Sequence, residues 1–204
     1  MKLVQRWVQA IGKKPRVLDM ARWMLEMGYH GHHRVIRQES LSACNRVLDL
    51  GCGTGTFAGM FDPARYTGVD IVPEYVAAAR AAHPGHTFEI MNAQQLAFPS
   101  QTFDACFIAG VIHHLDDAAA TAVLREVARV TRPDSPVVIW EDIPTRAWWN
   151  CIGRVVHRFD QGAYIRTPAQ YCAIVGGVLS IVASYHMQSG FMDYAVFRCR
   201  SAAT

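Results

Sequence analysis

The stretch RVLDLGCGTGTFAGM, residues 46–60, decides the fold. A short apolar run contains Asp49, and glycines follow at every second position as Gly51, Gly53 and Gly55. Such a pattern is typical of a strand that ends in a tight turn, because glycine lets the backbone turn sharply and approach a ligand closely. In an open parallel sheet, ligands bind beyond the carboxyl ends of the strands. This glycine loop is therefore the first candidate binding site.

Short apolar runs alternate with helical patterns from Arg46 to Asp142, which predicts an α/β fold. The expected strands are RVLDL, YTGVDI, TFEIMN, FDACFIAG and PVVIWED, followed by VLSIVASYHM and DYAVFRCR around a turn at Ser189-Gly190. We expect a Rossmann-like, open, mostly parallel seven-stranded sheet with helices on both faces and an antiparallel C-terminal strand pair. A helix is expected to begin near Phe57.

The length of 204 residues suits one domain, and 51% hydrophobic against 18% charged residues indicates a globular chain. We expect a single domain over residues 1–204, with an N-terminal helical cap at about 1–44 and an inserted helical lid at about 144–168. Within the cap, helices are expected at 2–12 and from Pro15 to Gly28. The longest apolar stretch, residues 172–183, is shorter than the roughly 20 residues of a membrane-spanning helix.

The six cysteines form no CxxC pair, which favours reduced thiols and a cytoplasmic location. No metal site is expected, because no cysteine or carboxylate completes the run HGHH at 30–33. The net charge is +3, with nine basic and three acidic residues in 1–46 (+6) and therefore −3 in the remainder. This modest net charge disfavours nucleic acid as a partner, whereas the excess of basic residues in 1–46 favours an anionic partner.

Two kinds of ligand fit the glycine loop. GTGTFA, residues 53–58, matches the G-x-G-x-x-A fingerprint of dinucleotide sites, in which a pyrophosphate rests on a helix N-terminus. Asp49 favours a cationic ligand instead, because its carboxylate would repel a pyrophosphate. Asp70 ends the next expected strand, 21 residues after Asp49, where a carboxylate accepts ribose hydroxyls under either interpretation. At the following strand end, the amide of Asn92 and the backbone N–H of Ala93 suit the edge of an adenine.

The segments VLDLGCGTG, GVDI, NAQQLAFPSQTFDACF and IHHL, in this order and spacing, resemble the class I S-adenosylmethionine-dependent methyltransferases. The sequence is similar to the small single-domain enzymes, including quinone-biosynthesis C-methyltransferases, over about residues 45–142. The resemblance implies S-adenosyl-L-methionine as cofactor. It implies the methionine end on Asp49, Gly51, Gly53, Thr54 and Gly55, the ribose on Asp70, the adenine between Ile71, Asn92 and Ala93, and the sulfonium near Ala109. Asn92 departs from the aspartate that many relatives have.

Candidate catalytic residues follow the fourth and fifth strands. His113 and His114 stand after FIAGVI, and imidazole is suited to proton transfer near neutral pH. Glu141 and Asp142 follow PVVIW and are candidates for acceptor binding or proton abstraction, or for capping the next segment. Methyl transfer needs a base only where the acceptor must lose a proton, and alignment of the reactants supplies much of the rate.

The expected lid contains an amphipathic, basic helix whose apolar stripe includes Trp148 and Trp149. Its stripe either packs on the core or gathers an acceptor, so both tryptophans are candidate substrate-binding residues; contact with a membrane surface is a further option. We expect a methyltransferase that acts on a small, partly apolar or lipid-like molecule. The alternatives are an NAD(P)-linked oxidoreductase and a non-catalytic S-adenosylmethionine-binding partner subunit.

Overall fold

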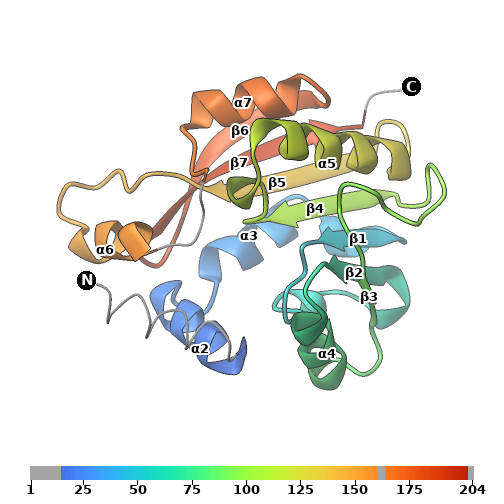
Figure 1. Cartoon of the computed structure of the whole chain (residues 1–204), viewed down its shortest axis with the longest axis horizontal. Coiled ribbons are helices and arrows are strands. Elements are labelled where there is room, and N and C mark those ends of the chain that lie inside the picture. The colour runs from blue at the N-terminus through green and yellow to red at the C-terminus, as the bar shows by residue number, and fades with distance from the viewer. Residues whose placement is uncertain (1–14, 160–163, 202–204) are drawn as a thin grey trace.

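A seven-stranded sheet runs through the protein in the order β3-β2-β1-β4-β5-β7-β6 (Figure 1). The computed structural model describes residues 15–159 and 164–201. The strands are β1 Val47–Leu50, β2 Tyr66–Asp70, β3 Thr87–Ile90, β4 Ala105–Ala109, β5 Pro136–Asp142, β6 Ser180–Ser189 and β7 Met192–Arg200. Neighbouring strands among β3, β2, β1, β4 and β5 pair in parallel, whereas β7 pairs antiparallel with both β5 and β6. The predicted mostly parallel sheet with an antiparallel C-terminal pair is confirmed.

The central strands are buried on both sides, as parallel strands between helical layers are. All four residues of β1 are buried. Side chains alternate between two hydrophobic clusters: Leu48 and Ile108 belong to one, and Phe107 and Trp140 to the other. This alternation explains why the strands read as nearly continuous apolar runs.

Helices cover both faces of the sheet (Figure 1). They are α2 Pro15–Leu25, α3 His30–Gln38, α4 Pro73–Ala82, α5 Asp117–Val130, α6 Cys151–Phe159 and α7 Pro168–Gly176. Buried residues of α5 and α7 join the cluster of Leu48, whereas those of α3 and α4 join the cluster of Trp140. Figure 1 shows α2 and α6 at the same end of the molecule. The helix expected at residues 2–12 lies outside the described residues.

The prediction of a helix that begins near Phe57 is wrong. Only two three-residue 3₁₀ helices, Ala58–Met60 and Pro63–Arg65, lie between the glycine loop and β2. Between Gly55 and the start of β2 at Tyr66 there are ten residues (66 − 55 − 1), and Gly59 and Pro63 among them disfavour an α-helix. The site therefore has no α-helix directly after the glycine loop.

Two helices were not predicted individually, although α3 lies within the expected helical cap. α3 carries only Val35 and Ile36 as large buried apolar residues, too few for a clear helical stripe. α7 had a readable signal: Thr167 and Gln170 form a capping box, in which each side chain binds the other residue's backbone N–H, and Pro168 occupies the first helical position.

Candidate functional site

The glycine loop turns at three residues with positive φ: Gly51 at 79°, Gly53 at 53° and Gly55 at 80°. Side chains are excluded at Gly51, where a Cβ atom would lie 2.2 Å from Val111 Cγ2. A Cβ atom at Gly53 would meet nothing within 4 Å. The loop therefore packs against the connection after β4 on one side and leaves open space for a ligand at Gly53.

Asp49 is a buried carboxylate in the middle of β1. The Tyr66 hydroxyl donates to its Oδ2 at 2.5 Å, while Oδ1 has no hydrogen-bond partner among the described residues. Burial raises the pKa of Asp49 to about 7; the hydrogen bond from Tyr66 opposes this rise and the negative charge of Asp70 adds to it. A cation held at this loop would stabilise the ionised form of Asp49, whose negative charge has no positive partner among its contacts with the described residues.

Asp70 ties the glycine loop to the end of β2. Its Oδ2 accepts from the backbone N–H of Gly53 at 2.9 Å, and its Oδ1 accepts from Val72 N–H at 2.9 Å. Each carboxylate oxygen retains a further lone pair, because an ionised carboxylate has about four acceptor positions. The side chain of the next residue, Ile71, is exposed. A ribose and an apolar contact for a base both fit this edge.

The remaining predicted cofactor residues lie at the carboxyl ends of the neighbouring strands. Asn92 follows β3 and its Oδ1 accepts from the Gln94 backbone N–H at 2.9 Å. Ala93 comes next, and Ala109 is the last residue of β4. Because β1, β2, β3 and β4 are parallel, these positions share one edge of the sheet.

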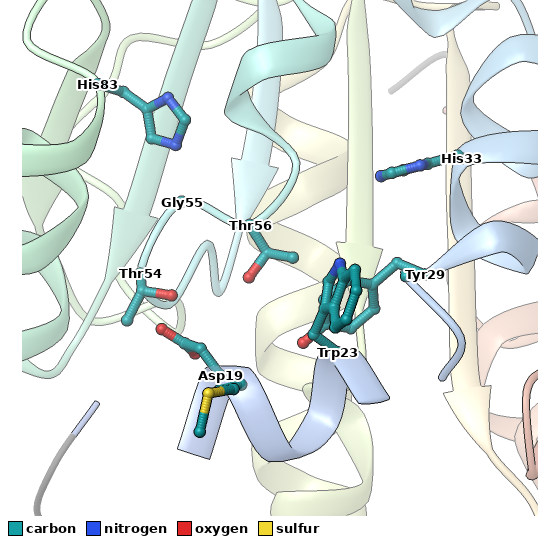
Figure 2. A pocket seen from close by; sticks show the side chains of 10 residues that line it. Asp19, Trp23, Tyr29, His33, Thr54, Gly55, Thr56 and His83 are labelled. Atoms are coloured by element: carbon teal, nitrogen blue, oxygen red, sulfur yellow. The ribbon is translucent and has the colours of Figure 1, made fainter. Parts of the chain in front are cut away.

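A cavity of about 420 Å³ lies between α2 and the glycine loop (Figure 2). Of the predicted residues, only Thr54 and Gly55 line it; the others in the lining are Asp19, Met20, Trp23, Gly28, Tyr29, His33, Thr56 and His83. In Figure 2 the Asp19 carboxylate faces the Thr54 side chain. The sequence predicted a helix over Asp19 and Trp23 but held no signal for the surface that this helix covers.

A second group of polar residues gathers where β4 and β5 end. Glu141 is fully buried, and its Oε1 accepts from the backbone N–H groups of Val111 and Ile112 at 2.9 and 2.8 Å. Its Oε2 accepts from His113 N–H at 3.1 Å and lies 2.8 Å from His113 Nδ1. Both oxygens are thus engaged in holding one loop, which favours a positioning role for Glu141 over the catalytic role predicted from the sequence.

His113 is buried between two carboxylates, with Nε2 3.8 Å from Asp142 Oδ2. His114 is exposed, and its ring centroid lies 4.1 Å from that of His113. The structure therefore brings His113, Glu141 and Asp142 together and leaves His114 at the surface. The catalytic roles of the two histidines stay predictions.

Arg166 holds the same loop from the other side and was missed by the sequence analysis. Its guanidinium donates to the carbonyl oxygens of Ile112 at 3.1 Å and Leu115 at 2.7 Å, which are the first residue of the 3₁₀ helix Ile112–His114 and the residue just after it. It also pairs with Asp117 Oδ1 at 2.7 Å. Because an arginine with this many contacts has no local sequence pattern, only the folded chain identifies it.

A further buried polar group adjoins Asp142 and was also missed. Glu26, His32 and Tyr194 are buried, and His32 Nδ1 lies 3.1 Å from Glu26 Oε2. Burial raises the pKa of Glu26 to about 7; the positive charge of Arg22 opposes the rise, and the negative charge of Asp142 adds to it. Glu26 directly follows α2, His32 lies in α3 and Tyr194 lies in β7, which is far from both in sequence.

Trp148 and Trp149 lie on the outer surface, 81% and 63% exposed. The inward-facing residue is Asn150, which is buried and donates to Phe191 O at 2.8 Å. The structure therefore does not bring the two tryptophans to the other predicted site residues. Their substrate-binding role stays a prediction.

The site fits an adenosyl cation better than a dinucleotide. Asp49 offers a buried, partnerless oxygen to a positive group, and the space at Gly53 admits the ligand. A pyrophosphate would meet that carboxylate, and the three-residue 3₁₀ helix after the loop offers no α-helical N-terminus to bind it.

Comparisons with known proteins identify a methyltransferase domain. The family described as a methyltransferase domain matches residues 47–134. A malonyl-[acyl-carrier protein] O-methyltransferase from Serratia marcescens is 31% identical over 107 residues, which are 52% of this chain and 41% of that protein. The ubiquinone/menaquinone biosynthesis C-methyltransferase UbiE from Bdellovibrio bacteriovorus is 30% identical over 133 residues, covering 60% and 56%. The chain thus spans about half the length of these curated relatives.

A solved structure shows the same fold. The N-methyltransferase NodS from Bradyrhizobium japonicum WM9, in complex with S-adenosyl-L-homocysteine, aligns with a TM-score of 0.66 and 18% identity over 84% of this chain and 86% of that one. Among the described residues, no helix has the length and apolar character needed to cross a membrane. The matched methyltransferase domain, these relatives and the fold support a class I S-adenosylmethionine-dependent methyltransferase, with S-adenosyl-L-methionine as its cofactor.

Proposed function

We propose that this protein transfers the methyl group of S-adenosyl-L-methionine to a small, partly apolar acceptor. The observation that carries the proposal is the buried Asp49 carboxylate with a partnerless oxygen beside an open glycine loop. In this proposal Asp49, Gly51, Gly53, Thr54 and Gly55 hold the methionine end. Asp70 holds the ribose, Ile71, Asn92 and Ala93 surround the adenine, and Ala109 lies near the sulfonium.

The bound cofactor supplies an electrophilic methyl group with its leaving group built in. The protein's own residues align the acceptor and exclude water, since proximity supplies much of the rate. Where the acceptor loses a proton, His113 is the proposed base. Glu141 accepts the Nδ1–H of His113, so Nε2 is the atom that takes up the proton. His114, exposed beside it, is the second candidate.

The acceptor class is inferred from two supports. The relatives' names describe O- and C-methyltransferases, one of them of quinone biosynthesis. The segments added around the sheet at α2 and α6 expose large apolar side chains. Nucleic acid is a weaker candidate, because the net charge is only +3.

We further propose the domain organisation expected from the sequence: one methyltransferase domain over 1–204, with a cap at about 1–44 and a lid at about 144–168. The cytoplasmic location is proposed on the six cysteines, which form no disulfide among the described residues. An NAD(P)-linked oxidoreductase is not favoured by the absence of an α-helix directly after the glycine loop.

The test is an incubation of the protein with methyl-labelled cofactor and a small-molecule extract. We expect label in a low-mass product that partitions into organic solvent. Asp70→Ala is the inactive comparison, and Val182→Ala, an exposed change on β6, is the matched active control. Tight S-adenosyl-L-homocysteine binding without any labelled product would favour the partner-subunit alternative, and label only in nucleic acid would refute the acceptor class.

A further inference from the structure

The turn between β6 and β7 holds both segments that are added to the sheet. Phe191 N–H donates to Leu25 O at the end of α2 at 3.0 Å, and Ser189 Oγ donates to Glu26 O at 3.1 Å. On its other side, Phe191 O accepts from Asn150 Nδ2 just before α6 at 2.8 Å. The end of α2 and the residue before α6 are therefore both anchored to one short turn.

Glycines make these contacts close. A Cβ atom at Gly190, where φ is +55°, would lie 2.1 Å from Leu25 O, and one at Gly153 would lie 2.6 Å from Phe191 O. Backbones approach this closely only where a side chain is absent. The end of α2 and the start of α6 are thus in close contact with the turn.

The α2 and α6 segments carry most of the exposed large hydrophobic residues of the described chain. Eight of twelve lie here, 47% to 81% exposed: Met20, Trp23, Met24, Met27, Trp148, Trp149, Ile152 and Val155. We call these eight residues the apolar face. Met20 and Trp23 also line the cavity at the glycine loop. Clustered exposed apolar residues of this size mark an interaction surface.

Basic side chains lie on both segments that carry the apolar face, with Asp19 as an acid on α2. Arg22, Arg146 and Arg154 are exposed, and residues 143–155 contain no acidic residue. The Arg22 guanidinium pairs with Glu26 at 3.4 Å, whereas the guanidinium groups of Arg146 and Arg154 form no ion pair in the described part of the chain; the Asp193 carboxylate near Arg146 accepts from its backbone N–H.

We propose that the apolar face docks on an anionic lipid bilayer. Tryptophan and methionine side chains enter the headgroup boundary, while arginines beside them pair with anionic headgroups. A purely apolar partner would leave Arg146 and Arg154 without counter-charges, so the combination favours an anionic lipid surface. The route of the acceptor rests on the proposed function: if the protein methylates a lipid-like molecule, that acceptor would reach the site from the bilayer.

The test is flotation of the full-length protein with vesicles of phosphatidylcholine alone or mixed with phosphatidylglycerol, without methyl donor. We expect binding to the anionic vesicles at low ionic strength, falling as salt rises. Absence of binding to the anionic vesicles, or equal binding to both kinds, would overturn the proposal. Because no methyl donor is needed, failure here is separate from failure of the methyltransferase assay.

Variants locate the surface. Trp148→Ala with Trp149→Ala, and separately Arg146→Gln with Arg154→Gln, should each lower the partition coefficient about tenfold or more. The matched controls Val182→Ala on β6 and Arg125→Gln on α5, both exposed, should change it less than twofold. Unchanged binding in the arginine variant refutes the assignment even if the tryptophan variant misfolds. If the unmodified protein instead forms a dimer and binds no vesicles, and the tryptophan variant is a monomer, the apolar face would be assigned to contact with a second copy of the chain.

Discussion

Asp49 gives a pH-dependent prediction at the scale of one residue. Its pKa is about 7 in the protein alone, against about 4 for an ordinary carboxyl, because it is buried. A ligand ammonium stabilises the ionised form, so a proton must leave Asp49 when the ligand binds below pH 7. The affinity for S-adenosyl-L-homocysteine should therefore rise up to tenfold per pH unit below about pH 7 and level off above it. Calorimetry from pH 5.5 to 8.5 measures this.

The control for this prediction is Asp49→Asn, which removes the titrating group but keeps the shape of the side chain. Its affinity should be lower at pH 8 and nearly independent of pH. An unchanged slope in this variant would assign the dependence to another group; Glu26, whose pKa is also about 7, is the first candidate. A flat profile in the unmodified protein would contradict the contact between Asp49 and a cation.

At the scale of elements, the connection from β4 to the 3₁₀ helix Ile112–His114 is held by Glu141. Its carboxylate accepts from three backbone N–H groups and from His113. Glu141→Gln replaces one acceptor oxygen by a donor that faces those N–H groups. We expect a loss of roughly 1–3 kcal/mol in the free energy of unfolding, measured in urea, because buried donors lose their acceptor.

The same variant distinguishes positioning from catalysis. If Glu141 acts by holding His113, kcat falls, while the affinity for S-adenosyl-L-homocysteine changes little. The exposed Glu74→Gln on α4 is the matched control and should change stability by less than about 0.5 kcal/mol. Unaltered stability of Glu141→Gln would show that its hydrogen bonds hold no part of the fold.

The elements differ in how far the sequence predicts them. Strands such as β1 and β5 are read directly, because burial on both faces makes them continuous apolar runs. The glycine loop and Asp70 are likewise predictable, since their positions follow from where strands end. α7 was missed although its Thr167–Gln170 capping box is a local signal, and the absent helix after Phe57 was predicted from composition without counting the ten residues available.

Contacts between distant segments had no such signal. Arg166 meets the carbonyls of Ile112 and Leu115, more than 50 positions away, and Glu26 meets His32 and the β6–β7 turn only after folding. The sequence identified an apolar stripe at Trp148 and Trp149, but amphipathicity alone does not say which side faces the protein. Asn150 decided that orientation by binding Phe191 O.

At the scale of the whole molecule, ligand choice follows from how the sheet and its additions combine. The carboxyl ends of β1 and β2 supply two acids, no α-helix directly follows the loop, and α2 lies over the cavity beside it. We expect this combination to select a cationic nucleoside over a pyrophosphate, although the fold alone serves both ligand classes.

Thermal unfolding tests that choice on the intact protein. A ligand at 100 times its Kd stabilises the folded state by about 2.7 kcal/mol, which for a chain of this length corresponds to about 5–10 °C in Tm. S-adenosyl-L-homocysteine should produce a rise of this size, and NADH at the same concentration should produce none. Asp70→Ala should lose the rise, because the loop and the ribose share that carboxylate. A shift with NADH that equals or exceeds the shift with S-adenosyl-L-homocysteine would mean that the acids at β1 and β2 do not exclude a pyrophosphate, and the oxidoreductase alternative would then be preferred.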